Sequence, residues 1–331
     1  MIKNALVWFK TDLRIEDNET LLKAIAQSEK IIPVYCFDEA HFETTPYGFK
    51  KTGSFRAQFL LESLEDLDAK LRTLGSGLRI VMGKPEVEIP KLVQEYKVQK
   101  VFAKREVAFE EIQTEKKVQS ELFKVRCELD RFSTSTLYRA EDLPFSIKDI
   151  PDVFTNFRKK TEKESEIRKP FLAPTKINSP EILPLELPTL EALGLTKTTI
   201  DSRAVLQFKG GESEALQRLN HYFFETQCLS TYKETRNGMV GANYSSKFSP
   251  WLALGCISPR FIYAEIKKYE KQFGANDSTY WLVFELLWRD FFRFMFKKHQ
   301  TKFFLYEGIK TEKVNSKSLN EKLLSQWKNG A

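Results

Sequence analysis

The sequence predicts an α/β N-terminal domain with a doubly wound parallel sheet over residues 1–135, and an all-α domain over residues 206–331. Three observations predict this division. Short apolar runs alternate with helical patterns in the first 135 residues, seven of the thirteen prolines lie between Pro144 and Pro188, and helical signals dominate after Gly210. Short buried strands that alternate with helices are typical of a parallel sheet covered on both faces.

Five apolar runs are the expected strands of the N-terminal domain, at residues 5–9, 31–37, 78–81, 100–103 and 125–129. Between the second and third runs, leucines at spacings of four and three predict a helix. These are Leu60, Leu64, Leu67, Leu71 and Leu74. Gly75 follows them, where a glycine commonly ends a helix. Because ligands of such sheets bind at the carboxyl ends of the strands, we expect a site at that edge.

Residues 136–205 are expected to form a long interdomain connector. Proline cannot continue a helix interior or a central strand, and this stretch holds seven prolines. It also carries the charged runs 158–160 and 162–164. We therefore predict neither a regular helix nor a central strand in it.

Capping residues mark the helices of the C-terminal part. Gly210 and Gly211 precede a helix that opens at Glu212, and Ser258 followed by Pro259 is an N-cap with a first-turn proline.

The longest expected helix runs from about Thr279 to Lys298, with Ser278 as its cap. Its core, residues 280–296, is apolar almost all round, so we expect this core to be buried on most sides. Four charged residues lie within this apolar sequence and require partners, since an unpaired buried charge is costly.

Composition excludes several classes of protein. Hydrophobic residues make up 42% of the 331 residues, which excludes disorder for most of the chain. No window holds 18 uncharged apolar residues, so no membrane span is expected. The first residues do not resemble a secretory signal. The cysteines are widely spaced, which favours reduced thiols and a cytoplasmic protein over a zinc ribbon or a disulfide scaffold. They are Cys36, Cys127, Cys228 and Cys256.

The excess positive charge lies in the last part of the chain. Residues 205–331 hold 19 Lys and Arg against 12 Asp and Glu, which accounts for the whole net charge of +7. A basic, aromatic-rich domain suggests a polyanionic partner, such as nucleic acid or a phosphate-bearing cofactor. A generic solubility charge is the alternative.

Common hydrolytic and nucleotide motifs are absent. The three histidines form no HExxH motif, and the sequence contains no GxSxG motif, no Walker motif and no GxGxxG after a strand. We expect no metal site.

Glu285, Trp288 and Arg289 share one face of the long helix, because their spacings are three and four. One interpretation is an ion pair between Glu285 and Arg289 beside a core tryptophan. The other is a wall for an aromatic, hydrogen-bonding ligand such as a base or a flavin.

Two polar segments lie before that helix. Residues 244–250 combine three hydroxyl groups in Tyr244, Ser245 and Ser246 with Lys247 and Ser249, and could bind a pyrophosphate. An ordinary serine-rich helix cap explains them equally well. Residues 232–238 add two cations and a turn signal, with a solvated loop as the alternative.

Three blocks of sequence carry a resemblance to a known family. Residues 7–21 read VWFKTDLRIEDNETL, residues 232–260 read YKETRNGMVGANYSSKFSPWLALGCISPR, and residues 278–294 read STYWLVFELLWRDFFRF. Together they resemble the photolyase/cryptochrome family, most closely its cryptochrome-DASH branch. In family order they imply a Rossmann-like domain, a long connector and a helical flavin-binding domain.

The resemblance implies an FAD enzyme that uses blue or near-UV light to split cyclobutane pyrimidine dimers, preferentially in single-stranded DNA. It implies that Glu285 hydrogen-bonds the dimer, that Trp288 packs on it and that Arg236 contacts DNA. It matches Arg289 to a flavin-side contact. The residues that it matches to the family's FAD-phosphate segment are Tyr232, Ser245, Ser246, Lys247, Phe248 and Ser249.

The resemblance also implies an antenna chromophore near the domain junction. The segment 104–111 occupies that region, with Glu106 or Glu110 as the candidate contact for 5,10-methenyltetrahydrofolate. An acidic cluster at a helix start is the alternative interpretation.

By resemblance, the flavin-binding domain is incomplete at Ala331. We expect its catalytic residues beyond Ala331 and none within the chain, and an outer electron-transfer tryptophan would align near Lys317. We also expect a monomer. Two other functions stay open: a flavin-based light sensor without repair activity, and a non-catalytic nucleic-acid-binding protein.

Overall fold

A five-stranded parallel sheet forms the centre of the N-terminal part in the computed structural model, which describes residues 1–197, 199–310 and 320–330. The strand order is β3-β2-β1-β4-β5. The strands are β1 (Ile2–Phe9), β2 (Ser28–Phe37), β3 (Arg79–Met82), β4 (Lys100–Lys104) and β5 (Glu128–Phe132). The order reverses between β1 and β4, as in a doubly wound sheet. The expected fold class is therefore confirmed.

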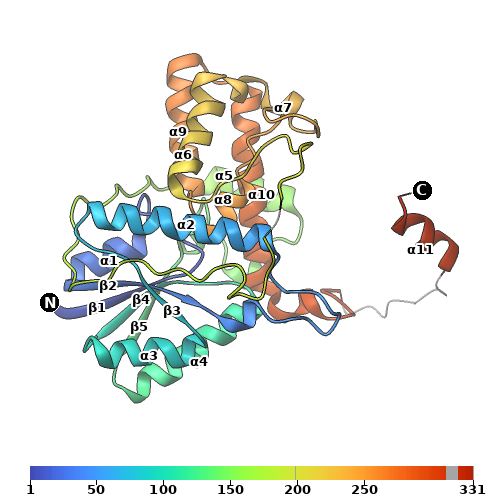
Figure 1. The fold of residues 1–331 in the computed structure, drawn as a ribbon. Helices are drawn as coiled ribbons and strands as arrows, with labels where there is room; N and C mark the ends of the chain where they lie inside the picture. Colours follow the sequence, from blue (N-terminus) through green and yellow to red (C-terminus); the bar gives the residue numbers. More distant parts are fainter. Residues whose placement is uncertain (198, 311–319, 331) are drawn as a thin grey trace.

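Helices cover both faces of this sheet (Figure 1). They are α1 (Glu19–Gln27), α2 (Ser54–Thr73), α3 (Pro85–Glu95) and α4 (Phe109–Lys124). Successive side chains of β1 point to opposite faces of the sheet, as in any strand, and pack against different helices. Val7 and Phe9 belong to the core with α1 and α2, whereas Leu6 and Trp8 belong to the core with α3 and α4.

The strand predictions located all five strands, but the fifth prediction is displaced. Residues 125–129 were expected, whereas β5 begins at Glu128. Val125 ends α4 instead, and Arg126 turns the chain with a φ of 57°. Val125 and Cys127 pack against the core from this turn, which explains their strand-like apolar pattern.

The prediction of no regular helix in the connector is wrong. Helix α5 (Phe154–Glu164) lies within it, between Pro151 and Pro170. These two prolines leave enough chain for three turns of helix, and Phe154 and Phe157 are buried. Short 3₁₀ turns, η2 (Ala140–Asp142) and η3 (Ile147–Asp149), precede α5, and a further one, η1 (Glu39–His41), follows β2.

The remaining elements are helical. They are α6 (Glu212–Asn220), the π-helical turn η4 (His221–Glu225), η5 (Cys228–Thr231), α7 (Tyr232–Thr235), α8 (Ser249–Leu254), α9 (Pro259–Phe273), α10 (Asp277–His299), η6 (Gln300–Phe304) and α11 (Glu321–Lys328). Two of the expected starts are confirmed. Gly211 precedes α6, and Ser258 caps α9 by accepting a hydrogen bond from the Phe261 backbone N–H.

The predicted cap of the long helix is wrong. Asn276 caps α10, because its side chain accepts hydrogen bonds from the backbone N–H groups of Ser278 and Thr279. The Ser278 hydroxyl instead accepts from the Lys233 backbone N–H and donates to Glu234, so it attaches α7 to the start of α10.

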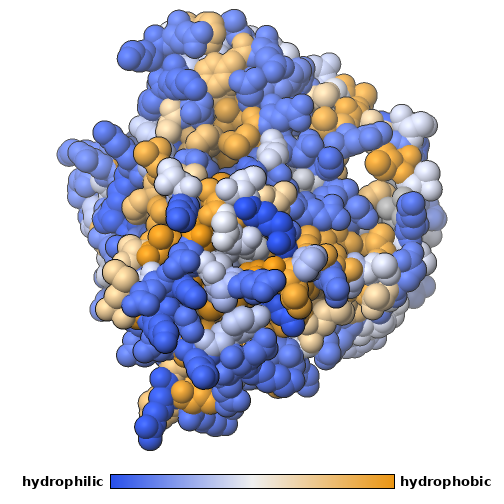
Figure 2. All heavy atoms as spheres, turned by 60° about the vertical axis from the view of Figure 1, so that its left-hand side comes forward, coloured by the Kyte–Doolittle hydropathy of each residue, from blue (hydrophilic) through white to orange (hydrophobic). Residues whose placement is uncertain are grey.

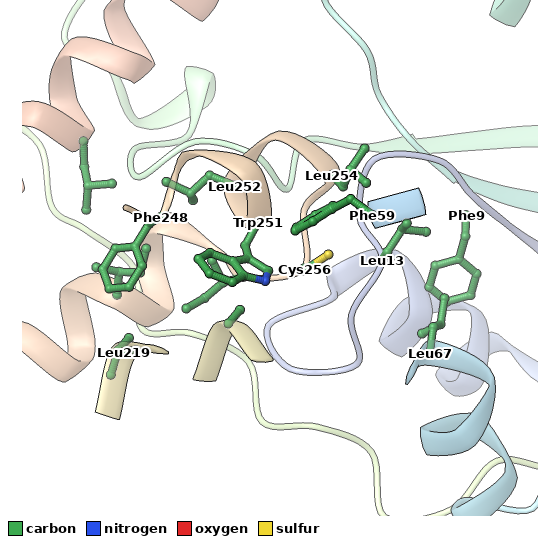
Figure 3. Packing of buried hydrophobic residues seen from close by; sticks show 14 of the residues in the cluster. Phe9, Leu13, Phe59, Leu67, Leu219, Phe248, Trp251, Leu252, Leu254 and Cys256 are labelled. Carbon is green, nitrogen blue, oxygen red and sulfur yellow. The ribbon is translucent and has the colours of Figure 1, made fainter. Parts of the chain in front are cut away.

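One hydrophobic core joins the sheet domain to the helical part. Figure 3 shows Phe9 and Leu67 from the N-terminal domain in the same cluster as Phe248 and Trp251 from the helical part. The contact is close at Gly255, where an added Cβ would lie 2.1 Å from the Thr11 carbonyl oxygen. A side chain there would separate the two parts.

A buried ion pair also stabilises the junction between the sheet domain and the helical part. Asp17 accepts hydrogen bonds from the Ser258 hydroxyl at 2.5 Å and from Arg260 Nη2 at 2.7 Å. Asp17 and Arg260 are both buried, and these bonds satisfy charges that would otherwise be costly to bury.

The surface is mixed in character. Figure 2 shows hydrophilic residues over most of one face, with apolar patches interspersed among them. Within the described ranges, no helix is long and apolar enough to cross a membrane. The same residues contain no cluster of three His, Cys, Asp or Glu side chains suited to a metal ion. The four cysteines form no disulfide.

Candidate functional site

The four charged residues within the apolar part of α10 have partners outside their own helix. Glu285 pairs with Arg236 of the segment after α7, at 2.8 Å between Oε1 and Nη1. Arg289 donates to the backbone carbonyls of Ser135 and Leu252, the latter at 3.1 Å. The ion pair between Glu285 and Arg289 that helical spacing allowed is not formed.

The other two of these charges connect α10 to the N-terminal side. Asp290 is fully buried and accepts hydrogen bonds from the backbone N–H groups of Leu137 and Tyr138, at 3.0 and 2.9 Å. Burial raises the pKa of Asp290 to about 7, against the lowering effect of these hydrogen bonds. Arg293 Nη2 lies 3.8 Å from Glu106 Oε2. These contacts explain why so apolar a helix carries charges.

Tyr232, Arg236 and Glu285 converge between α7 and α10. Tyr232 is buried, and burial together with nearby Glu285 raises the pKa of its hydroxyl to about 12. The Arg236 guanidinium and the Lys233 ammonium lie over the ring of Trp281, at 5.6 and 5.0 Å from its centroid. Two cations, a carboxylate and aromatic surface therefore adjoin one another, and cations beside aromatic rings are common contacts of nucleic-acid-binding proteins.

The hydroxyl-rich segment 244–249 lies against α7. Thr235 connects them, since its hydroxyl donates to the Tyr244 carbonyl at 2.9 Å. Ser246 and Phe248 are buried, and Ser249 is exposed at the start of α8. Lys247 has a positive φ of 59°, an uncommon conformation outside glycine that marks a functional turn or a strained one.

Trp288 and Arg289 face a different space from Glu285. The Trp288 ring stacks on Phe154 of α5, with centroids 3.5 Å apart and planes 14° apart. An open hollow of about 480 Å³ adjoins it and is lined by Val107, Ala108, Trp288, Arg289, Phe292, Arg293 and Phe296. Phe292 is 54% exposed there.

A cleft at the carboxyl ends of β1 and β2 holds both candidate antenna residues. Its volume is about 210 Å³, and its lining includes Trp8, Lys51, Glu106, Glu110 and Leu254. Because Leu254 belongs to α8, the cleft lies at the junction of the two parts. This is the edge where a ligand of a parallel sheet is expected.

Glu106 and Glu110 differ in their freedom to bind a ligand. Glu106 accepts from the Thr11 hydroxyl at 2.8 Å and from Lys104 Nζ at 3.0 Å. Burial acts to raise the pKa of Glu106, but Lys104 and further cations outweigh it and lower that pKa to about 2. Burial lowers the pKa of Lys104 to about 8. Glu110 is exposed and pairs with Lys51.

The structure thus groups the sequence-derived site residues into four places, one of which is the segment 245–249 against α7. Glu285 and Arg236, the expected dimer and DNA contacts, meet, and Tyr232 adjoins them. Trp288 and Arg289 line the separate hollow, and the two glutamates share the cleft. Lys317 lies outside the described residues.

Sequence reasoning missed Arg218, Lys104 and Asp290. Asp290 had a signal, since a carboxylate in an apolar helix requires partners. Arg218 had none, because its partners lie 24 to 28 residues further along the chain. Lys104 lies in the segment 104–111, of which only the glutamates were candidates, although its partner is Glu106.

A sequence model of the DNA photolyase family matches residues 5–176. The chain belongs to the DNA photolyase family. Its resemblance to the cryptochrome-DASH branch is confirmed by a curated relative, the cryptochrome DASH of Gloeobacter violaceus. That relative is 48% identical over 309 residues, which are 93% of this chain and 62% of the relative.

Solved structures of this photolyase family have the same fold. A crystal structure of a Synechocystis sp. cryptochrome superposes with a TM-score of 0.93 at 44% identity, over 100% of this chain and 68% of that one. A Sulfolobus tokodaii photolyase, solved with two FAD molecules, has a TM-score of 0.70 at 23% identity over 99% of this chain and 67% of that one, and so shows the fold alone. The chain spans about 62% of the length of the first curated relatives that it matches.

Proposed function

We propose that this chain acts as an FAD-dependent DNA photolyase of the cryptochrome-DASH type. Its substrate would be cyclobutane pyrimidine dimers, preferentially in single-stranded DNA. One observation carries the proposal: Arg236 and Glu285, the expected DNA and dimer contacts, lie 2.8 Å apart beside buried Tyr232, although 49 residues separate them in sequence. Membership of the photolyase family supports it.

The residues present suit the diphosphate of FAD. Ser245 and Ser246 supply hydroxyls, Lys247 a cation, and the buried Arg218 guanidinium beneath them pairs with no carboxylate among the described residues. Such donors hold a phosphate through charge-assisted hydrogen bonds. Bound FAD would supply the light-driven electron transfer, which is the chemistry of the cofactor rather than of any side chain.

The pairing of Arg236 with Glu285 would prepare the substrate contacts. Arg236 orients Glu285, so that its second oxygen can accept a hydrogen bond from a pyrimidine N–H or exocyclic group. Arg236 keeps donors for a phosphate oxygen, since a guanidinium carries five N–H groups. A dimer that is already unpaired or damaged costs less to flip out, which favours single-stranded substrate.

We also propose that the cleft at β1 and β2 accepts the folate antenna. Glu110 is the better placed contact, because it is exposed and can exchange Lys51 for a ligand amine. The acceptor capacity of Glu106 is already used by Thr11 and Lys104. A cytoplasmic monomer remains part of the proposal; four free cysteines agree with a reducing compartment such as the cytoplasm.

Light-driven repair is the test of the proposed function. The chain is incubated with FAD, gel-filtered and photoreduced under anaerobic conditions. It is then illuminated at blue wavelengths with a thymidine oligonucleotide that contains one dimer. We expect restored absorbance at 260 nm and a repaired oligonucleotide by chromatography, with none in a dark control.

The outcomes separate the three functions. FAD bound in stoichiometric amount without dimer loss refutes repair and favours a light sensor. Colourless protein that still binds single-stranded DNA, with an affinity that falls steeply with salt, favours a non-catalytic binding protein.

A further inference from the structure

Arg218 is a buried cation without a counter-charge. It lies on α6 and is 7% exposed, yet no carboxylate pairs with it within the described ranges. Burying an ionised group without an opposite charge is costly in a protein interior. Burial accordingly lowers the pKa of Arg218. The surroundings are therefore suited to a negatively charged group that the chain itself does not supply.

The guanidinium donates only to the segment 242–246. Nε donates to the Ser246 carbonyl at 3.1 Å, and Nη2 donates to the carbonyls of Ala242 and Ser245 at 2.7 and 3.1 Å. Nη1 donates to Oδ1 of Asn243 at 3.0 Å. The acceptors are neutral dipoles, so they orient Arg218 without neutralising it. One side chain thus shapes the whole turn.

This arrangement turns backbone donors away from Arg218. In a trans peptide, the carbonyl of one residue and the N–H of the next point in opposite directions, and the described chain has no cis peptide bond. Because the carbonyls of Ser245 and Ser246 point at Arg218, the N–H groups of Ser246 and Lys247 point to the opposite side. Neither N–H group makes a hydrogen bond within the described part of the chain.

The turn continues in a conformation that gathers N–H groups. Lys247 is left-handed with a φ of 59°, and Phe248 is right-handed with φ −72° and ψ −10°. Successive residues of opposite hand form an anion-binding concavity from consecutive N–H groups. Phe248 is held in place by the core cluster, in which Figure 3 also shows Leu219, the neighbour of Arg218.

We propose that Arg218 is the positioning residue of a diphosphate site formed by Ser245, Ser246 and Lys247. It holds the turn so that the free N–H groups and hydroxyls face the ligand, and it supplies a buried positive charge. With Lys247 it provides two cations, which match the two negative charges of a dinucleotide diphosphate. The inference rests on the proposed function and deepens it, since it assigns to Arg218, which does not belong to the turn itself, the role of shaping the turn for the diphosphate.

Pyrophosphate binding to the chain without flavin tests the inference. Calorimetry measures the affinity for inorganic pyrophosphate and ADP, with adenosine as the ligand that lacks phosphate. Arg218→Met should weaken pyrophosphate and ADP binding by about 10-fold or more, the effect of a lost charge-assisted interaction. Lys267→Met, on exposed α9, is the matched control and should leave both affinities unchanged.

Salt dependence separates a charge role from a merely structural one. Arg218→Met should reduce the slope of log affinity against log salt concentration, because salt then screens the attraction of one cation fewer. Asn243→Ala removes one acceptor of Arg218 and keeps the charge, so its slope should equal that of the natural chain. Arg218→Lys keeps the charge but not the planar fork, and should lower affinity at an unchanged slope.

Two results would overturn the inference. One is a natural chain that binds neither pyrophosphate nor ADP. The other is an Arg218→Met variant, or an Arg218→Lys variant if the first does not fold, with unchanged affinity and slope. If dimers are repaired and these variants bind pyrophosphate with unchanged affinity, only the role of Arg218 is refuted and the proposed function stands. Arg218-dependent pyrophosphate binding without dimer repair refutes only the proposed function.

Discussion

Replacing Asp290 by asparagine is expected to remove a pH-dependent part of the stability of the chain. Asp290 is fully buried on α10 and attaches that helix to residues 137 and 138 through two backbone hydrogen bonds. Its neighbours Arg289 and Arg293 and the two hydrogen bonds favour the ionised carboxyl, but burial opposes them more strongly and raises the pKa from 3.8 to about 7. Asparagine has nearly the same shape and does not titrate.

The direction in which stability changes with pH follows from the number of protons bound by the folded and unfolded chains. Between pH 4 and 7 the folded chain keeps a proton on Asp290 that the unfolded chain has lost, so stability falls as the pH rises through this window. A displacement of about three pKa units corresponds to about 4 kcal/mol in total, of which about 3 kcal/mol falls between pH 5 and 8. The free energy of unfolding of Asp290→Asn, relative to the natural chain, should therefore increase by about 3 kcal/mol over that interval.

Urea unfolding followed by circular dichroism at pH 5 and pH 8 measures this difference. Other titrating groups are common to both proteins and cancel. The introduced asparagine side chain can accept only one of the two backbone hydrogen bonds, but that loss is the same at both pH values. A difference that stays constant between pH 5 and 8, or that becomes smaller, would refute the assignment of a buried, protonated carboxyl.

Three further substitutions test the site. Glu285→Gln should lower the yield of dimer splitting while flavin content is unchanged, because it weakens the dimer contact and the pairing with Arg236; repair yield per absorbed photon is the measurement. Lys247→Glu should reduce the FAD retained after gel filtration, since it places a negative charge beside a diphosphate. Glu106→Gln should lower the free energy of unfolding by about 3 kcal/mol, because it leaves the buried Lys104 ammonium without its partner; thermal and urea unfolding measure it.

Each substitution has a control and a contradicting result. An unchanged photon yield in Glu285→Gln would exclude the dimer contact. Lys267→Glu, on exposed α9, controls for added negative charge, and equal flavin content in both lysine variants would contradict the role of Lys247. Glu110→Gln removes an exposed ion pair and should change stability by less than about 1 kcal/mol. A loss as large as that of Glu106→Gln would argue against burial as the cause.

The positions of the strands and most helix starts followed from the sequence because they depend on neighbouring residues. Apolar runs located all five strands, and Ser258 with Pro259 identified the start of α9. Local signals were misleading where two of them competed. Asn276 rather than Ser278 caps α10, since the Ser278 hydroxyl is engaged with α7. The high proline content of the connector led to the wrong prediction that it holds no helix. Prolines limit where a helix can begin and end, but the proline-free residues between Pro151 and Pro170 form α5.

Only the tertiary structure shows which partners the charged residues have. Helical spacing allowed Glu285 to pair with Arg289, but Glu285 pairs with Arg236, and Arg289 donates to two carbonyls. Arg218 had no signal in the sequence, since three of its four hydrogen bonds go to backbone carbonyls, which any sequence provides. A buried charge pairs with a polar group that tertiary packing brings near it, and spacing along the sequence does not predict which group this is.

By itself, the sequence determined the fold class and the family and indicated candidate site residues, because apolar periodicity and short motifs are local properties. The tertiary structure decided which of those residues meet. It joined Arg236 to Glu285, placed Glu106 and Glu110 in one cleft at the junction, and set Arg218 beneath the turn that precedes α8. The cleft depends on the core that the two parts share, whereas the other two contacts arise because helices distant in sequence pack together within the helical part.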